Sequence, residues 1–223
     1  MKRSEINALI ADAKVFFREH RFMLPPWAFW GPKDWKGKGQ TEVVANQLGW
    51  DLTDYGEGKF HERGLILFTL RNGNLATGHT KPYAEKIMIV GEGQICPMHF
   101  HWSKMEDIIN RGGGNLVIEL NGSDDEECFS GKPLAVMVDG IERVVEPGGT
   151  VVLEPGESIT LEKGMYHRFY GEAGKGRVLV GEVSSVNDDN TDNRFYRPMP
   201  RFPEIEENES PLHLLCTDYP RYV

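Results

Sequence analysis

The stretch GQICPMHFHWSKMEDIINRGG, residues 93–113, decides both the fold and the chemistry of this chain. His99 and His101 are separated by one residue, and residues i and i+2 of a β-strand point to the same face of a sheet. Glu106 follows five residues later, a distance that lets the chain turn and return a carboxylate to the same place. Imidazole and carboxylate ligands together suit Mn²⁺, Fe²⁺, Zn²⁺, Co²⁺ or Ni²⁺. The stretch therefore indicates part of a metal centre.

A third histidine, His167, lies in another strand-like segment, LEKGMYHRFYG (residues 161–171). Three histidines and one glutamate leave two positions of an octahedron open, which is typical of a catalytic rather than a closed structural site. An H-x-H pair on a strand is by itself most often two polar residues on an exposed face. Here its neighbours are mostly apolar: Cys96, Pro97, Met98 and Phe100. We therefore predict a metal centre with four ligands: His99, His101, Glu106 and His167.

Working outward, the middle of the chain consists of short strand-like runs with turn signals such as Asn72-Gly73, Asp139-Gly140 and Pro155-Gly156 between them. Short strands at roughly ten-residue spacing, without long helices between them, favour an antiparallel sandwich or barrel. The runs are Leu65–Arg71, Lys86–Val90, Gly93–Phe100, Asn115–Asn121, Leu134–Asp139, Glu142–Val145, Thr150–Leu153, Ser158–Leu161, His167–Phe169 and Val178–Val183.

The two ends of the chain differ from this middle. An apolar stripe at steps of three and four predicts a helix over Ser4–Arg18, with Ser4 as its N-cap. Residues 21–38 hold three prolines and three tryptophans, so we expect a packed irregular segment there, followed by a short helix over 41–48. We predict a single domain, 1–223: an N-terminal helical and irregular part (1–60), a β-barrel core (65–185) and a C-terminal tail packed on the barrel (186–223).

Composition excludes several classes of protein. The formal charge is −9 and the isoelectric point about 5.3, which argues against a non-specific nucleic-acid binder or a basic membrane-surface protein. No apolar run approaches the ~20 residues that span a bilayer. The three cysteines are odd in number and widely scattered, so they form no disulfide framework. We expect a soluble cytoplasmic protein that binds neither nucleic acid nor a membrane.

The spacing of these residues resembles a known family. Gly93-x5-His99-x-His101-x4-Glu106-x6-Gly113 is similar to the first cupin motif at every position. Gly156-x5-Glu162-x-Gly164-x2-His167-x3-Gly171 is similar to the second motif, with Glu162 in place of a proline and Gly171 in place of an asparagine. The resemblance implies an all-β-dominated cupin fold, a double-stranded β-helix or jelly-roll barrel, and the same four metal ligands.

Three further strings narrow the resemblance: HFHWSKMED (99–107), EVSSVNDDNTDNRFYRPMPRFPEIEE (182–207) and LHLLCTDYP (212–220). With the chain length and the N-terminal helix, they resemble the bacterial D-lyxose isomerases, which are cupin-fold, Mn²⁺-dependent ketol isomerases. The resemblance implies a homodimeric enzyme that interconverts D-lyxose and D-xylulose, and also D-mannose and D-fructose, with the metal polarising O1 and O2 of the free sugar. Co²⁺, Fe²⁺ or Zn²⁺ are alternatives to Mn²⁺.

Isomerisation moves a hydrogen between C1 and C2, which requires a base near both carbons. Glu182 is our candidate, because it shares the strand parity of the apolar Val178 and Val180 and so points inward, unless it faces water or pairs with an arginine. Lys104 lies between the H-x-H pair and Glu106; it is a candidate to stabilise an oxyanion or shuttle a proton, the alternative being a solvent-directed loop lysine.

Three more residues are candidate sugar contacts: Lys86, Asp192 and Arg194. Lys86 alternates with apolar residues in its strand and is expected to enter the barrel. Asp192 and Arg194 belong to a charged cluster after Glu182, for which a surface salt-bridge loop is the ordinary explanation. No role is assigned to His61 or His79.

Other functions remain open at this stage. An Fe²⁺ dioxygenase would use the same ligands, a phosphosugar isomerase would share the reaction, and a sugar-binding cupin would perform no chemistry. The charged residues after Glu182 disfavour an oxygenase for apolar substrates. The lack of a Gly-rich phosphate loop or of a clustered Arg/Lys pair, together with the net negative charge, disfavours a phosphorylated substrate.

Overall fold

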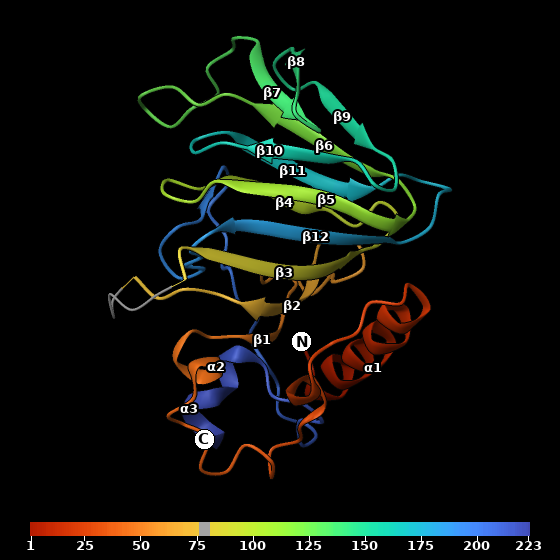
Figure 1. The fold of residues 1–223 in the computed structure, drawn as a ribbon, viewed down its shortest axis with the longest axis vertical. Coiled ribbons are helices and arrows are strands. Elements are labelled where there is room, and N and C mark those ends of the chain that lie inside the picture. The colour runs from red at the N-terminus through yellow and green to blue at the C-terminus, as the bar shows by residue number, and fades with distance from the viewer. Residues whose placement is uncertain (76–80) are drawn as a thin grey trace.

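Two antiparallel sheets lie face to face in the computed structural model, which describes residues 1–75 and 81–223 (Figure 1). His79 lies outside the described residues. Within them, one sheet has eight strands in the order β1-β2-β3-β12-β5-β10-β7-β8 and the other has five in the order β13-β4-β11-β6-β9. The strands are β1 (Gly49–Thr53), β2 (Leu65–Arg71), β3 (Tyr83–Val90), β4 (Cys96–Phe100), β5 (Glu106–Gly113), β6 (Leu116–Asn121), β7 (Leu134–Val138), β8 (Ile141–Val145), β9 (Thr150–Leu153), β10 (Ser158–Leu161), β11 (Tyr166–Gly171), β12 (Val178–Ser185) and β13 (Arg194–Phe195). This is the cupin jelly roll that the sequence motifs imply.

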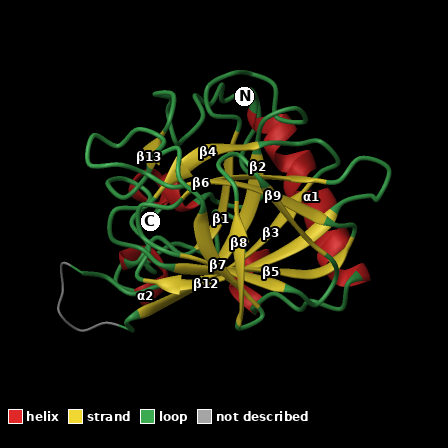
Figure 2. Cartoon of the chain, turned by 90° about the horizontal axis from the view of Figure 1, so that it is seen from above, coloured by secondary structure: helices red, strands yellow, loops and turns green. Residues whose placement is uncertain are grey.

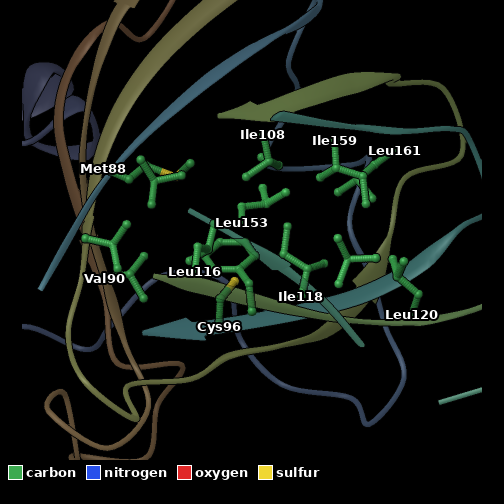
Figure 3. Close-up of a cluster of buried hydrophobic side chains, with 14 of the residues drawn as sticks. Met88, Val90, Cys96, Ile108, Leu116, Ile118, Leu120, Leu153, Ile159 and Leu161 are labelled. Carbon is green, nitrogen blue, oxygen red and sulfur yellow. The ribbon is translucent and has the colours of Figure 1, made fainter. Parts of the chain in front are cut away.

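The space between the sheets is filled by alternate side chains of both. On β12, Val178 and Val180 are fully buried, as expected for inward positions of a strand with a period of two. They pack in one apolar cluster with residues of the facing sheet, among them Leu116, Ile118 and Leu153 (Figure 3). Burial of this apolar surface is the main force holding the two sheets together.

A helix covers the outside of the barrel beside β1 and β2 (Figures 1 and 2). Helix α1 runs from Arg3 to Glu19, one residue longer at each end than the predicted helix, and buries its apolar stripe against Trp50 and Phe68. Ser4 is not the N-cap: Lys2 occupies that position, and the backbone N–H of Ser4 donates to Oδ1 of Asn208 at 3.1 Å. Asn208 of the C-terminal tail therefore accepts a hydrogen bond from an N–H group in the first turn of the helix, where the sequence predicted a local N-cap.

The C-terminal tail is tied to this helix by a buried ion pair. The Arg3 side chain is fully buried and donates to both carboxylate oxygens of Asp218 and of Glu207, at 2.8 to 2.9 Å. Such bidentate pairs fix geometry as well as charge. The tail ends in a 3₁₀ turn (Cys216–Asp218) and the short helix α3 (Tyr219–Tyr222), beside the chain's N-terminal part.

The tryptophan-rich segment is packed, as predicted. A 3₁₀ turn, Pro26–Phe29, interrupts it, and Trp35 is buried against Trp27, Trp30 and Tyr219. The short helix that follows, α2 (Glu42–Ala45), is shorter than the predicted 41–48. No helix in the described ranges combines the length and apolar character needed to cross a membrane.

Three strands were not predicted: β1, β5 and β13. In β1 and β5 some buried positions carry polar side chains, which hides the apolar alternation, and β13 has only two residues. In β5 the inward residues are Glu106, Ile108 and Asn110. Asn110 is fully buried because its amide donates to the carbonyl oxygens of Gly114 and Leu153, both at 2.9 Å. In β1 the buried polar residues are Asp51 and Thr53.

Candidate active site and metal centre

The four predicted ligands meet between the sheets. His99 on β4 is the direct partner of His167 on β11, and His101 follows immediately after β4. The ligand atoms of these three buried histidines all lie within 4.8 Å of one another. Glu106, the first residue of β5, reaches them from the other sheet: its Oε1 is 3.2 Å from Nε2 of His167 and 3.5 Å from Nε2 of His101.

The backbone sets which nitrogen of each ring carries the proton. Nδ1 of His99, His101 and His167 lies 2.7, 2.5 and 3.0 Å from the carbonyl oxygens of Pro97, Asp192 and Met165, respectively. Because a carbonyl can only accept, each Nδ1 carries the hydrogen and each neutral ring keeps a bare lone pair on Nε2. Carbonyl partners of this kind orient histidine ligands in metal sites.

The Nε2 atoms of His101 and His167 are buried and have no hydrogen-bond partner in the described part of the chain. Both lone pairs face the Glu106 carboxylate, so acceptors converge with no proton between them. Burial lowers the pKa of both His99 and His101, which keeps these rings neutral. Burial alone would raise the pKa of Glu106, but Lys104 and the neighbouring histidines together outweigh it and hold that pKa well below its usual range. This donor set fits a divalent cation.

A chain of charged side chains continues from Glu106. Nζ of Lys104 lies 2.6 Å from Oε2 of Glu106 and 2.9 Å from Oε1 of Glu182. The same oxygen of Glu182 lies 3.3 Å from Nζ of Lys86, the residue directly opposite Glu182 on β3. Burial alone would lower the pKa of Lys104, but the Glu106 and Glu182 carboxylates raise it, so the ammonium stays charged.

These groups line a cavity of about 40 Å³. That is room for a few waters and less than the ~300 Å³ of a typical ligand pocket. The lining of the cavity combines these polar groups with apolar side chains, among them Leu65, Met88 and Phe169. Six of the predicted site residues line it: Lys86, His99, His101, Lys104, Glu106 and Glu182. His167 lies beside the cavity, in contact with Glu106.

Asp192 and Arg194 do not line this cavity. The Asp192 carboxylate accepts from the backbone N–H groups of Ser103 and Lys104, both at 2.9 Å, so it holds the loop that carries Lys104. Nε of Arg194 donates to Oε2 of Glu127 at 2.7 Å, on the outer side of the barrel wall. His61 borders a different pocket, beside helix α1.

Sequence reasoning missed part of the cavity wall, namely Tyr55, Asp189, Asn193 and Arg201. Asp189 and Arg201 both lie in the stretch 182–207. Nothing in the local sequence pattern distinguishes them from charged residues that face solvent. One signal was present: Asp51 interrupts an apolar stretch, and a buried carboxylate requires a cation. That cation is Arg201, whose Nη2 lies 2.5 Å from Oδ2 of Asp51.

Two facing antiparallel sheets with three histidines and a glutamate between them define a cupin with a site able to hold a metal. The sequence model of the D-lyxose isomerase family matches residues 1–219, and the chain belongs to this family. It is 48% identical to a D-lyxose/D-mannose isomerase of Escherichia coli O157:H7 and 46% identical to one of Serratia proteamaculans, each over the full length of both chains.

Solved structures agree on the fold. The L-ribose isomerase of Cellulomonas parahominis, solved with L-ribose, is similar over 92% of this chain and 98% of its own, with a TM-score of 0.61 and 18% identity. The cupin architecture expected from the sequence motifs is therefore confirmed.

Proposed function

We propose that this chain is a metal-dependent aldose–ketose isomerase that interconverts free D-lyxose and D-xylulose, and also D-mannose and D-fructose. The observation that carries the proposal is one cavity in which bare histidine lone pairs, a carboxylate ligand and the Lys104–Glu182–Lys86 charges converge. Its family membership and its two named relatives support the same reaction.

In this proposal His99, His101, Glu106 and His167 hold one divalent metal, Mn²⁺ by resemblance. When bound there, the metal would polarise O1 and O2 of the sugar and acidify whichever of the two is a hydroxyl. The neutral rings and the ionised Glu106 described above are the protonation states that such a centre needs.

Glu182 is the proposed base, removing a proton from one of C1 and C2 and returning it to the other, while the hydroxyl proton moves between O2 and O1. Its carboxylate is buried beside two ammonium groups and lies in the same cavity as the ligands. Lys104 is held charged by its two carboxylate partners, so it suits stabilising negative charge on the sugar oxygens rather than removing a proton. Lys86 is the proposed sugar contact on the other side of Glu182.

The sugar must separate some of these ion pairs to enter, because the cavity is smaller than a pentose requires. Sugar hydroxyls can replace the contacts that Glu182 makes with Lys86 and Lys104, since they both donate and accept hydrogen bonds. The homodimer stays a prediction. The roles of Asp192 and Arg194 as sugar contacts stay predictions as well.

The test is isomerisation in D₂O. Protein stripped of metal and then supplied with Mn²⁺ is incubated with D-lyxose or D-mannose and followed by proton NMR, with the stripped protein as the control. We expect ketose from both sugars only when the metal is present. Deuterium at the exchanged carbon would support proton transfer rather than a hydride shift.

Ketose without deuterium would keep the isomerase but favour a hydride shift or a proton shielded from solvent. No ketose from either sugar would contradict the proposal. Oxygen uptake with Fe²⁺, turnover of sugar phosphates, or sugar binding without turnover would then identify the dioxygenase, the phosphosugar isomerase or the binding protein, respectively.

A further inference from the structure

Unpartnered polar atoms are concentrated in the candidate active site. Among the described residues, four buried side-chain nitrogen or oxygen atoms have no hydrogen-bond partner, and three of them belong to residues in or around the one cavity: Nε2 of His101, Nε2 of His167 and Nη1 of Arg201. Buried groups of this kind are rare in folded proteins, and each needs an explanation. The metal centre accounts for the two histidines but not for the arginine.

Arg201 comes from the C-terminal tail and is held rigidly. Its Nη2 lies 2.5 Å from Oδ2 of Asp51 on β1 and 3.2 Å from Oδ2 of Asp189, and its guanidinium lies over the ring of Phe202 at 5.0 Å. The two carboxylates outweigh the effect of burial and raise the pKa of Arg201, so it is charged. One edge of the guanidinium is thus clamped, while the N–H groups on Nη1 are left without an acceptor.

The position of Arg201 relative to the reacting groups follows from the ion pairs. Oε1 of Glu182 is 3.3 Å from Nζ of Lys86, which is 3.9 Å from Oδ2 of Asp189, the same oxygen that contacts Arg201. Lys86 and Asp189 therefore link the proposed base to Arg201, and all four residues line the same cavity. A ligand that has its reacting carbons at Glu182 and extends along these contacts would bring its remaining carbons to Arg201.

The chemistry of Nη1 limits what it can bind. A guanidinium only donates, so its partner must be an oxygen lone pair. Asp51 and Asp189 already neutralise its charge, and a phosphate brought to Nη1 would lie beside two carboxylates that repel it. A neutral hydroxyl oxygen has no such conflict.

We propose that Nη1 of Arg201 binds a hydroxyl of the sugar remote from C1 and C2, and so sets which sugars are accepted and excludes phosphorylated ones. The proposal rests on the proposed isomerase function and adds to it a substrate-binding residue. Arg201 touches the part of the sugar that does not react, so its contribution depends on the hydroxyl pattern of the substrate.

The test pairs a variant with altered sugars. The specificity constant kcat/KM is measured for wild type and for Arg201→Lys, each with D-lyxose and with its 3-, 4- and 5-deoxy forms. Lysine keeps a charge against Asp51 and Asp189 but lacks the second edge of the fork. Arg143→Lys is the matched control, because Arg143 is half-exposed at the far edge of the sheet, 4.0 Å from Glu157.

We expect one deoxy sugar to lose about 10- to 100-fold in kcat/KM with wild type, and Arg201→Lys to lose the same factor with D-lyxose. Arg201→Lys should have the same kcat/KM with that deoxy sugar as with D-lyxose, because the variant already lacks the contact. Metal content should be unchanged, and Arg143→Lys should match wild type throughout.

A flat response of wild type to all three deoxy sugars would overturn the proposal without any variant. Wild-type kinetics in Arg201→Lys would also overturn it. So would a loss of kcat/KM in that variant that is equal for every sugar and comes with a lower Tm, because this pattern indicates a purely structural role. If Arg201→Lys does not fold, Arg201→Gln is measured on the same sugars.

Binding separates this proposal from the proposed function. D-arabinitol, the alcohol obtained by reducing D-lyxose, cannot isomerise, and its affinity is measured by calorimetry. If wild type makes no ketose but binds D-arabinitol about 10-fold or more tightly than Arg201→Lys does, the reaction is wrong and the Arg201 contact stands. Equal affinity, or no binding by either protein, would overturn the contact.

Discussion

The two ends of the barrel interior are built from the same strands and have opposite character. At one end, inward positions are mostly aliphatic or aromatic, as in the cluster of Figure 3, with the buried Asn110 of β5 as an exception. At the other end, the next inward position of the same strand carries a polar group. The pairs, apolar then polar, are Val180 and Glu182 on β12, Met88 and Lys86 on β3, Phe169 and His167 on β11, and Ile108 and Glu106 on β5.

This difference separates stability from chemistry along each strand. The apolar end buries surface and fixes the backbone, so polar side chains two residues further on are held in place without contributing to the core. The polar end holds unpaired lone pairs and buried charges, which cost free energy. The stability of the fold should thus depend on the apolar end, and activity should depend on the polar end.

The largest expected effect comes from His167→Ala at the polar end. Loss of a direct ligand should weaken metal binding by more than the about 10- to 100-fold that loss of an outer partner costs, and turnover should fall with it. Metal per chain after gel filtration and ketose formation are the measurements. Phe169→Leu, the matched change two residues away, should keep the metal. An active, metal-free His167→Ala would remove this residue from the site.

Glu182→Gln should keep the metal and lose kcat by about 10²- to 10⁴-fold, because an amide cannot accept the proton. Glu85→Gln makes the same change on an outward position of β3, where Glu85 pairs with Arg71, and should leave kcat unchanged. Rates of ketose formation and of deuterium exchange at the sugar carbon give the comparison. A wild-type kcat in Glu182→Gln would show that the base is another group.

The smallest effect on activity is expected from Ile159→Val at the apolar end. Ile159 is fully buried, and removing one methyl group should lower the free energy of unfolding by about 1 kcal/mol. Metal content and kcat should match wild type, as measured by denaturant unfolding beside the kinetic assay. A drop in kcat without loss of metal would mean that the two ends are mechanically coupled.

The sequence was most informative where a local pattern has a direct spatial meaning. His99 and His101 share a face because of the strand period, and together with their apolar neighbours this predicted that both imidazoles point into one buried space, as they do. The same rule placed Glu182 inside the barrel, where it is 4% exposed. Turn residues marked the ends of most strands, which is why β2, β9 and β10 were predicted at their observed bounds.

Contacts between distant segments could not be predicted in this way. Asp192 and Arg194 were chosen from a charged string, yet the string has no period that says which members point inward. The structure directs Asp192 to backbone N–H groups and Arg194 to Glu127, while Asp189 and Arg201 reach the cavity. Which of several similar charges enters the barrel depends on how the tail crosses it, and this is a property of tertiary packing.

The pairing of Arg3 with Glu207 and Asp218 has a consequence for how the chain is made. Helix α1 leaves the ribosome before the barrel strands, but the carboxylates that neutralise its buried arginine lie 204 and 215 residues later. The helix therefore cannot complete its docking until Glu207 and Asp218 have been synthesised. Closure of this longest loop is a late step, slow compared with forming the helix itself. The barrel strands are translated before these ion pairs of Arg3 can form.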